Sequence, residues 1–424
     1  MIEAVNARGY PAVSVAEVSR LAGVSKRTFY EQFADKEACF LATYDSIVDC
    51  ALQRIDQARA WHERDWEGGL RGAFEAFVLA AAEQPKAARL ALIDVFGAGP
   101  VAVERLERAR ARLEQSLAAG IREAPHAAPL PPVVLRGIVY GFEHVVRANL
   151  LSGSDQRLMG AAGELATWAL AQTSPAVAEL AQASRTTNGG WPRLRERDDE
   201  RARLGRAAVE IVVRDGQDQL TTAAILARAR LPEPAFRRYY VTAEECFLDA
   251  LDLVALEALT SAAAASRTAG DGPRGACRGI VALISYVVED PLLRRIIQLD
   301  SYAADTATIV RRERRLSRFA DLLATRLPRS QRPPSVLAQA AVGSVWGVIC
   351  HYVTNDATRL LPDLVDQLAY VALAPLVGSE TAVATILAEH DLDPAMPDET
   401  RRRRGQRLDL AASESARRAD TNRH

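Results

Sequence analysis

The chain has 424 residues, of which 49% are apolar and 25% are charged, and its formal net charge is −1. This length predicts two to four domains, and the composition is that of a globular protein, which excludes a wholly disordered chain. Because the charges nearly cancel, the molecule as a whole has no positive electrostatic field that would attract nucleic acid. Any affinity for DNA must therefore come from locally placed residues.

The number of cysteines and the length of the apolar runs disfavour several further classes of protein. The five cysteines are an odd number without a CxxC pair, which disfavours a disulfide framework and a structural zinc site. The start lacks a basic region followed by a long apolar run, and no uninterrupted apolar stretch reaches about 18 residues. We therefore expect a cytoplasmic protein with no metal, no cofactor and no membrane association.

The first predicted helix near the start of the chain is bounded by a capping box and a turn glycine. Ser14 and Glu17 have the spacing at which a serine covers the free amides of the first turn while the glutamate reaches back. The helix that follows is expected to bury Val18 and Leu21. Gly23 ends it, because glycine accepts the left-handed conformation that a tight turn requires.

A second helix, 26–33, follows this turn, with Ser25 as its expected N-cap. Phe29 and Phe33 lie four residues apart and so anchor one side of it. The side chains that then point outward are Lys26, Arg27, Thr28 and Tyr30. Asp35 is the expected cap of a long third helix that runs to about residue 59. Two helices joined by a tight glycine turn predict a helix-turn-helix.

The segment GYPAVSVAEVSRLAGVSKRTFYEQFADKEACFLATYD, residues 9–45, resembles the N-terminal DNA-binding domain of TetR-family regulators. The resemblance implies that the second helix enters the major groove of DNA, with Lys36 on a phosphate at the start of the third helix. The implied DNA contacts are Ser14, Ser25, Lys26, Arg27, Thr28, Tyr30 and Lys36. The alternative is a surface helix of an ordinary bundle.

One departure from the family concerns the first helix. Family members usually have a longer one, often preceded by a basic arm, whereas Met1 stands only eight residues before Gly9. Either this helix is truncated or the true start lies upstream. Missing phosphate contacts would weaken binding at physiological salt.

The stretch 60–175, and again 255–378, resembles more loosely the helical ligand-binding and dimerisation domain of the same family, with apolar residues at three-and-four spacing. This implies a small apolar effector, whose binding shifts the separation of the DNA-binding heads. The candidates to line its pocket are Phe74, Phe77, Phe96, Phe142, His144, Trp168, Tyr286, Tyr302, Trp346 and His351. Ordinary core packing is the alternative for all of them.

Four further helices occupy the positions of the family's dimer bundle. They are 133–150 with 157–171, and 335–352 with 360–374. We expect them to pair within one chain as an intramolecular pseudo-dimer. A further homodimer of the chain stays open.

The chain also repeats itself. A shift of 207 places puts Glu37-Ala-Cys-Phe-Leu on Glu244-Glu-Cys-Phe-Leu, and Gly9, Ala22 and Phe29 on Gly216, Ala229 and Phe236. At a shift of one residue less, Glu83-Gln-Pro85 meets Glu289-Asp-Pro291. The sequence therefore predicts two tandem copies of one fold.

The second helix-turn-helix is altered at every reading position. Glu17 becomes Ala224 and Gly23 becomes Arg230, which costs on the order of 1 kcal/mol if the turn stays left-handed. Ser25, Lys26, Arg27 and Lys36 become Pro232, Glu233, Pro234 and Ala243, respectively. The second head is expected to be a structural remnant, with residual DNA contact from Arg237 and Arg238 as the alternative.

The predicted fold class is all-α, a helix-turn-helix domain plus a helical ligand-binding and dimerisation domain, repeated twice. The boundaries are 1–48 for the first head, 49–183 for the first regulatory domain, 184–199 for a linker, 200–254 for the degenerate second head and 255–390 for the second regulatory domain. Residues 391–424 are expected to form a disordered basic tail.

No phosphate loop, GxSxG elbow, HExxH pair or cluster of His and Cys occurs, so an enzyme is not expected. The preferred hypothesis is a sequence-specific transcriptional regulator, a repressor that binds double-stranded DNA under control of the apolar ligand. The rival hypothesis is a ligand- or partner-binding helical scaffold that has lost productive DNA recognition. An enzyme that uses the helical cavity is a third, weaker alternative.

Overall fold

The computed structural model of the chain describes residues 1–61, 65–123, 130–153, 155–181, 199–270, 272–301, 306–327 and 332–390. Within these ranges every regular element is a helix and no strand occurs, which confirms the all-α prediction. The expected tail 391–424, the linker 184–199 except for Asp199, and Tyr302 lie outside the described residues.

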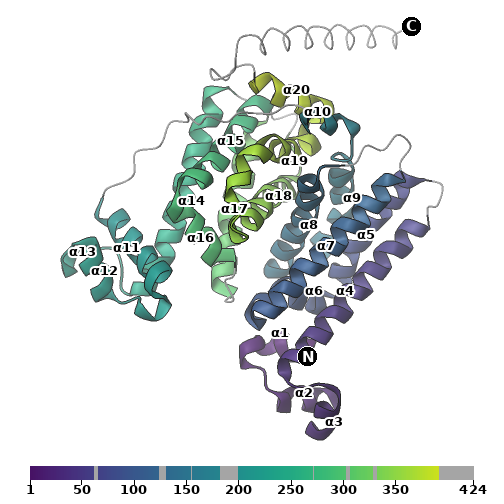
Figure 1. Cartoon of the computed structure of the whole chain (residues 1–424), viewed down its shortest axis with the longest axis horizontal. Coiled ribbons are helices and arrows are strands. Elements are labelled where there is room, and N and C mark those ends of the chain that lie inside the picture. The colour runs from purple at the N-terminus through teal and green to yellow at the C-terminus, as the bar shows by residue number, and fades with distance from the viewer. Residues whose placement is uncertain are drawn as a thin grey trace.

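The first half of the chain forms a small head and a body of long helices (Figure 1). Its elements are α1 (Ile2–Arg8), η1 (Tyr10–Ala12), α2 (Val15–Ala22), α3 (Lys26–Gln32), α4 (Lys36–Ala60), α5 (Trp66–Glu83), α6 (Pro85–Leu92), η2 (Asp94–Ala98), α7 (Pro100–Arg122), α8 (Pro132–Ser152), α9 (Asp155–Leu170), η3 (Pro175–Val177) and α10 (Ala178–Ala181).

The second half follows the same order of a short-helix head and a long-helix body. Its elements are α11 (Glu200–Asp215), η4 (Gln217–Gln219), α12 (Thr222–Ala229), α13 (Glu233–Arg237), α14 (Ala243–Thr268), α15 (Pro273–Glu289), α16 (Pro291–Ser301), α17 (Thr306–Arg326), α18 (Ser335–Thr354), η6 (Thr358–Leu364), α19 (Val365–Val377) and α20 (Ser379–His390). The main difference lies at the start, where α11 has 16 residues and α1 has seven.

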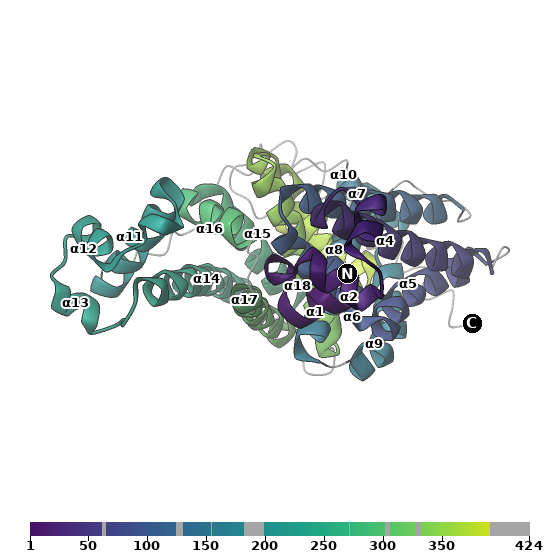
Figure 2. The same ribbon diagram turned by 90° about the horizontal axis from the view of Figure 1, so that it is seen from below.

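The two heads lie apart, each at the far end of a long helix that enters the body (Figures 1 and 2). The first head sits on α4 and also contacts α6 and η2 of the body. Its apolar core continues without a break into residues of α6, η2 and α7, such as Leu90, Val95 and Leu106. The second head has an apolar core of its own, formed by α11, α12, α13 and the start of α14.

The two halves meet where α8 crosses α18. The crossing point is Gly141, which lies so close to the opposite helix that a Cβ would stand 2.5 Å from Ser344 Oγ and 2.9 Å from the Ala340 carbonyl oxygen. On its other side the same Cβ would be 2.4 Å from Trp168 Cη2. Only a residue without a side chain lets the backbones approach this closely.

The close approaches around Gly141 come in exchanged pairs. Gly137 of α8 lies against Ser344 of α18, and the counterpart of this contact is Ala340 of α18 against Gly141 of α8. In the same way, Gly343 of α18 lies against His144 of α8, and the counterpart is Tyr140 of α8 against Gly347 of α18. If Gly141 is equated with Ser344, each contact has a partner in which the two helices exchange roles. A two-fold axis between two helices produces this pattern.

Two segments of the second half are long and apolar enough to cross a membrane by length and composition. They are Ser335–Thr354, with a mean hydropathy of 1.5, and Thr358–Val377, with a mean hydropathy of 1.4. Both contact α8, and residues such as Ile349, Leu368 and Tyr370 are fully buried in the body. Their apolar character is accounted for by this core position.

Charged residues line the same junction in a reciprocal arrangement. His144 of α8 lies 2.9 Å from Glu313 of α17, and His351 of α18 lies 3.6 Å from Glu107 of α7. Arg110 adds a bidentate pair within the first half, with its Nε 3.0 Å and its Nη2 2.6 Å from the carboxylate of the buried Glu143. Each half thus supplies one histidine to a glutamate of the other half.

The local charges dominate the titration of both junction glutamates. Burial alone would raise the pKa of Glu313, but His144, Arg147 and Arg312 outweigh it and lower the pKa to about 2. For Glu107 the pKa is also lowered to about 2, because His351 and Arg110 outweigh burial. Both carboxylates therefore stay charged at neutral pH, which satisfies the buried cations that face them.

The crossing point predicts a strong effect of one added methyl group. We expect Gly141→Ala to lower the free energy of unfolding by about 1–3 kcal/mol, because the methyl group has no space between Trp168 and the backbone of α18. Denaturant unfolding of the purified chain measures this. The matched control is Gly160→Ala, an exposed helical position with nothing within 4 Å, which should be neutral or slightly stabilising. Equal behaviour of the two variants would contradict the close crossing.

The lowered pKa values predict acid sensitivity. A carboxyl group whose folded pKa lies below its unfolded value of 4.5 stabilises the fold above pH 4.5 and loses this contribution as the pH falls toward 2. For Glu313 the full loss is on the order of 3 kcal/mol. In urea unfolding, Glu313→Gln should flatten the decline of stability from pH 5 to pH 3, whereas exposed Glu104→Gln should keep it. An unchanged decline in Glu313→Gln would contradict the pairing.

Candidate nucleic-acid interface

The first helix of the helix-turn-helix, α2, begins and ends as its sequence predicts. Ser14 is the N-cap, and its Oγ accepts a hydrogen bond of 3.3 Å from the Glu17 amide. Gly23 closes the helix in the left-handed conformation, at φ 69° and ψ 25°. The capping box is only half formed, however, because the Glu17 carboxylate accepts a hydrogen bond of 3.5 Å from Arg8 of α1 instead of reaching back.

The packing of α2 corrects a second expectation. Val18 is buried, as predicted, but Leu21 is 45% exposed, and Ser19 takes the other buried position. The reason is the orientation of α2, which turns Val18 and Ser19 toward the core of the head and leaves Leu21 in its last turn on the outward side. The apolar side chains of Leu21 and Val24 are thereby exposed on both sides of the turn.

The reading helix α3 is capped at its start and anchored through its aromatic side. The Ser25 Oγ accepts a hydrogen bond of 3.0 Å from the Thr28 amide, which fixes the first turn. Phe29 is only 4% exposed, and its ring lies 5.5 Å from that of the half-buried Phe33. These contacts hold the opposite side of α3 outward.

The outward side of α3 is polar and cationic, as predicted. Arg27 has a side chain that is 90% exposed and makes a surface ion pair of 3.1 Å with Glu31, and Tyr30 is 56% exposed. Ser14, Ser25, Lys26 and Thr28 are also exposed. A helix of this kind fits the major groove, where Lys and Arg neutralise phosphates and Arg and short polar side chains read base edges.

Sequence reasoning missed three exposed neighbours of this surface, Arg20, Leu21 and Val24. Arg20 adds a cation at the end of α2, and the two apolar side chains could contact thymine methyl groups in a groove. The signal for Val24 was its place in the turn, which leaves no helix to bury it.

Lys36 has a different local role from the one expected. Its Nζ donates a hydrogen bond of 3.1 Å to the Tyr10 carbonyl oxygen and lies 4.2 Å from the centre of the Tyr10 ring. Lys36 therefore fastens η1 to the start of α4. An ammonium group has three N–H donors, so the predicted phosphate contact stays a prediction.

The second head keeps the turn geometry of the first with different residues. Thr221 caps α12 through a hydrogen bond of 3.2 Å from the Ala224 amide. Arg230 occupies the position of Gly23 in the left-handed conformation, at φ 53° and ψ 49°. The helix that follows, α13, has only five residues, and Pro232 at its N-cap offers no side-chain hydrogen bond.

The two arginines at the end of α13 are held by acidic neighbours. Arg237 lies 2.7 Å from Glu233 within α13, and Arg238 lies 2.7 Å from Glu200 of α11. A phosphate would have to compete with these carboxylates and would meet their charge at close range.

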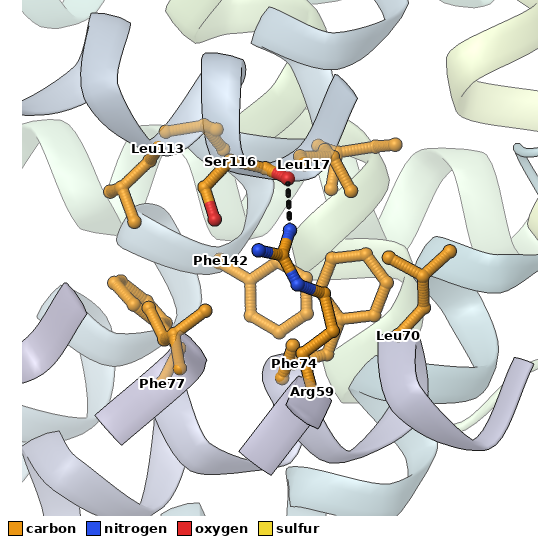
Figure 3. A pocket seen from close by; sticks show the side chains of 12 residues that line it. Arg59, Leu70, Phe74, Phe77, Leu113, Ser116, Leu117 and Phe142 are labelled. Carbon is orange, nitrogen blue, oxygen red and sulfur yellow. Dashed lines mark hydrogen bonds between the residues drawn. The ribbon is translucent and has the colours of Figure 1, made fainter. Parts of the chain in front are cut away.

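Among the predicted pocket residues, the structure brings three together in the first half. Phe74, Phe77 and Phe142 line one cavity of about 60 Å³ between α4, α5, α7 and α8 (Figure 3). The rings of Phe74 and Phe142 are stacked, with centroids 5.2 Å apart. Arg59, which sequence reasoning missed, reaches into the same cavity and donates a hydrogen bond of 3.0 Å to the Ser116 carbonyl oxygen.

The other first-half candidates lie elsewhere. Trp168 contacts Phe142 edge-on, at 5.9 Å, but is packed into the α8–α18 crossing. Phe96 packs against the core of the first head, because η2 runs beneath that head. His144 pairs with Glu313 at the junction. None of the three lines the cavity.

In the second half, Trp346 lines a cavity of about 60 Å³ between α14, α15, α17 and α18. Tyr286 lies in a separate cavity beside the second head and donates a hydrogen bond of 3.4 Å to Glu257. His351 lies at the junction, with its Nδ1 3.5 Å from the Tyr140 hydroxyl. In the described ranges no group of three or more His, Cys, Asp or Glu side chains is placed to hold a metal ion.

Comparison with known proteins fits the geometry of the first head. Residues 2–43 match the family model for bacterial regulatory proteins of the tetR family. The chain carries a TetR-family DNA-binding domain. The match spans α1 to the first part of α4 and supports a DNA-binding transcriptional regulator; regulators of the tetR family are generally not enzymes. No curated protein matches the chain.

The two turns of the TetR-like head and its counterpart offer a matched pair of substitutions. Gly23→Ala should lower the free energy of unfolding by about 1 kcal/mol, because a side chain is strained at φ 69°. Arg230→Gly should raise it by up to about 1 kcal/mol, since it relieves the same strain at φ 53°. Urea unfolding measures both changes. Effects of the same sign would contradict the equivalence of the two turns.

Proposed function

We propose that the chain is a ligand-controlled transcriptional repressor whose first head binds one operator half-site. The observation that carries this proposal is α3, which exposes Lys26, Arg27 and Tyr30 while Phe29 anchors it from behind. The charge needed for DNA affinity is thus local, as the near-zero net charge requires.

The proposal includes a tandem duplication, with one head and one regulatory domain in each copy. The shared order of helices from α1 to α9 and from α11 to α19 supports it. So does the left-handed turn that both heads keep with different residues. The proposed units are 1–48 and 49–183 in the first copy, and 200–254 and 255–390 in the second.

The two regulatory domains form an intramolecular pseudo-dimer in this proposal. The exchanged contacts at the α8–α18 crossing and the reciprocal histidine–glutamate pairs support it, because both are typical of an isologous interface. One chain would then fill the role of a conventional dimer, in the cytoplasm and without a membrane.

The pseudo-dimer would have one reading head. In the altered head Glu233 takes the place of Lys26 and Pro234 that of Arg27, and the arginines that follow, Arg237 and Arg238, pair with Glu233 and Glu200. Helix-turn-helix dimers span half-sites about 34–36 Å apart, which needs two reading heads. A palindromic operator therefore requires two chains, whereas one chain alone would bind a single half-site.

Selection of bound sequences from random duplex DNA, together with the solution mass of the complex, tests the regulator proposal. A single enriched motif supports one competent head per chain, and an inverted repeat with doubled mass supports two associated chains. Recovery of no enriched sequence would instead favour a ligand- or partner-binding scaffold.

Substitutions in the two heads should show which head binds DNA and which is only a structural remnant. Lys26→Ala and Arg27→Ala are each expected to weaken binding and to reduce the salt dependence of log K by about one phosphate contact. Arg237→Ala, at the corresponding helix of the second head, is the charge-matched control and should leave affinity unchanged. Electrophoretic mobility shifts at several salt concentrations measure this. A larger loss in Arg237→Ala would overturn the assignment of the reading head.

A further inference from the structure

The two body cavities are lined by residues at matching positions. On α7 the first cavity is lined by Leu113, Ser116 and Leu117, and on α17 the second is lined, at the same spacing, by Phe319, Leu322 and Leu323. On α4 and α14 the matching pairs are Ile55 with Arg59, and Ala262 with Ser266. The cavities therefore occupy the same place in their halves.

Each cavity contains one arginine, but the two arginines come from different helices. In the first cavity the guanidinium belongs to Arg59 at the end of α4, and the residue facing it on α7 is Gly120. In the second cavity the position of Arg59 is Ser266, and the position of Gly120 is Arg326, which lines that cavity. Both cavities thus have one arginine, which belongs to α4 in the first half and to α17 in the second half.

The two positions lie next to each other. A Cβ on Gly120 would stand 2.7 Å from Leu70 Cδ2 and 3.4 Å from Arg59 Cδ, so Leu70 and the stem of Arg59 both lie over this glycine. An arginine at both positions would crowd one space, and a small residue at both would leave that end of the cavity apolar. Both halves instead place one guanidinium there.

Arg59 has donors left for a ligand. Its Nη1 donates to the Ser116 carbonyl oxygen at 3.0 Å, and its Nη2 lies 3.5 Å from Asp56, whose side chain is 56% exposed. The Arg59 side chain is itself only 24% exposed. A guanidinium has five N–H donors, and a carboxylate matches their fork geometry.

The rest of the first cavity is apolar and adjoins a larger one. Beyond the guanidinium lie Phe74, Phe77 and Phe142 (Figure 3). Phe77 and Leu113 also line a second cavity of about 280 Å³ between α4, α5, α6 and α7. A ligand whose chain passes these two side chains would occupy both spaces.

We propose that each body cavity binds an amphipathic monocarboxylate, with its acid group on the arginine and its apolar chain among the aromatic and aliphatic side chains. This inference rests on the proposed function and names the chemical class of its effector. The first half accepts the longer chain, because its cavity adjoins the space of about 280 Å³, whereas the second adjoins one of about 30 Å³ that shares Phe319 and Trp346.

A structural role is the competing explanation for both arginines. Arg59 and Arg326 lie in the last turns of α4 and α17, where a cation interacts favourably with the helix dipole. An arginine that only stabilises a helix end would contribute equally to the binding of charged and uncharged ligands. The discriminating quantity is therefore the preference for a carboxylate over an alcohol of the same chain length.

Calorimetric titration of the full chain with sodium decanoate and with 1-decanol tests the proposal. We expect a strong decanoate site in the first half, a weaker one in the second half because its space is smaller, and at least tenfold weaker binding of decanol at each. Arg59→Met should abolish this preference at one site and Arg326→Met at the other, whereas Arg59→Lys should retain part of it. Arg112→Met, which removes an arginine of α7 that pairs with Asp49 at the surface, is the matched control and should bind like the parent chain.

Equal binding of decanoate and decanol, or an unchanged preference in Arg59→Met, would overturn the proposal. Thermal unfolding without ligand shows whether each variant is folded, and Arg59→Lys keeps the test valid if Arg59→Met is not. DNA binding is measured on the same samples. If selected DNA binds and decanoate does not, the carboxylate inference fails while the regulator proposal stands. If decanoate binds but no DNA sequence is enriched, the regulator proposal fails instead.

Discussion

The close crossing of α8 and α18 is the constraint on which the rest of the molecule depends. Because Gly141 brings the two backbones together, the apolar faces of α9 and α19 can close around them, and the two halves share one core. The charged side chains of α7 and α17 then come within reach of histidines from the opposite half. The arrangement also sets the places of the heads, since each is carried by a long helix that leaves the shared body at its own side. Neither head contacts the crossing itself; each is held away from it by its own long helix and by the body helices on which it packs.

The heads show that the architecture of a helix-turn-helix and its reading chemistry are separable. Both heads close the first helix with a left-handed residue, although one uses glycine and the other accepts the strain of Arg230. Both bury a phenylalanine, Phe29 or Phe236, beneath the second helix. What differs is the outward surface: α3 carries Lys26 and Arg27 against Glu31, whereas α13 carries Arg237 against Glu233. Packing in the core preserves the shape of the motif even where nothing preserves its contacts with DNA.

A physical connection between cavity and head runs along α4. Its first turn is capped by Asp35 and held to the head by Lys36, and its last turns supply Ile55 and Arg59 to the cavity wall. The first head also rests on α6 and η2, so its core continues into the body, whereas the second head has a core of its own. A ligand that displaces α4 would therefore shift the reading helix together with α6, η2 and the first half of α7, on which the head is also packed. Rigid helices and continuous packing transmit such a shift because packed cores resist small deformations.

The sequence by itself determined the all-α class, the caps and the turn of the helix-turn-helix, and which side chains of α3 point outward. These features depend on interactions within a few residues along the chain. Ser14, Gly23, Ser25 and Phe29 all act as local spacing predicts. Only the tertiary structure decided which aromatic side chains share a cavity. Phe96, His144, Trp168 and His351 are drawn into the head core and the junction by contacts with distant segments. The exposure of Leu21 and the entry of Arg59 into the cavity likewise depend on how separate helices approach one another, which no local pattern encodes.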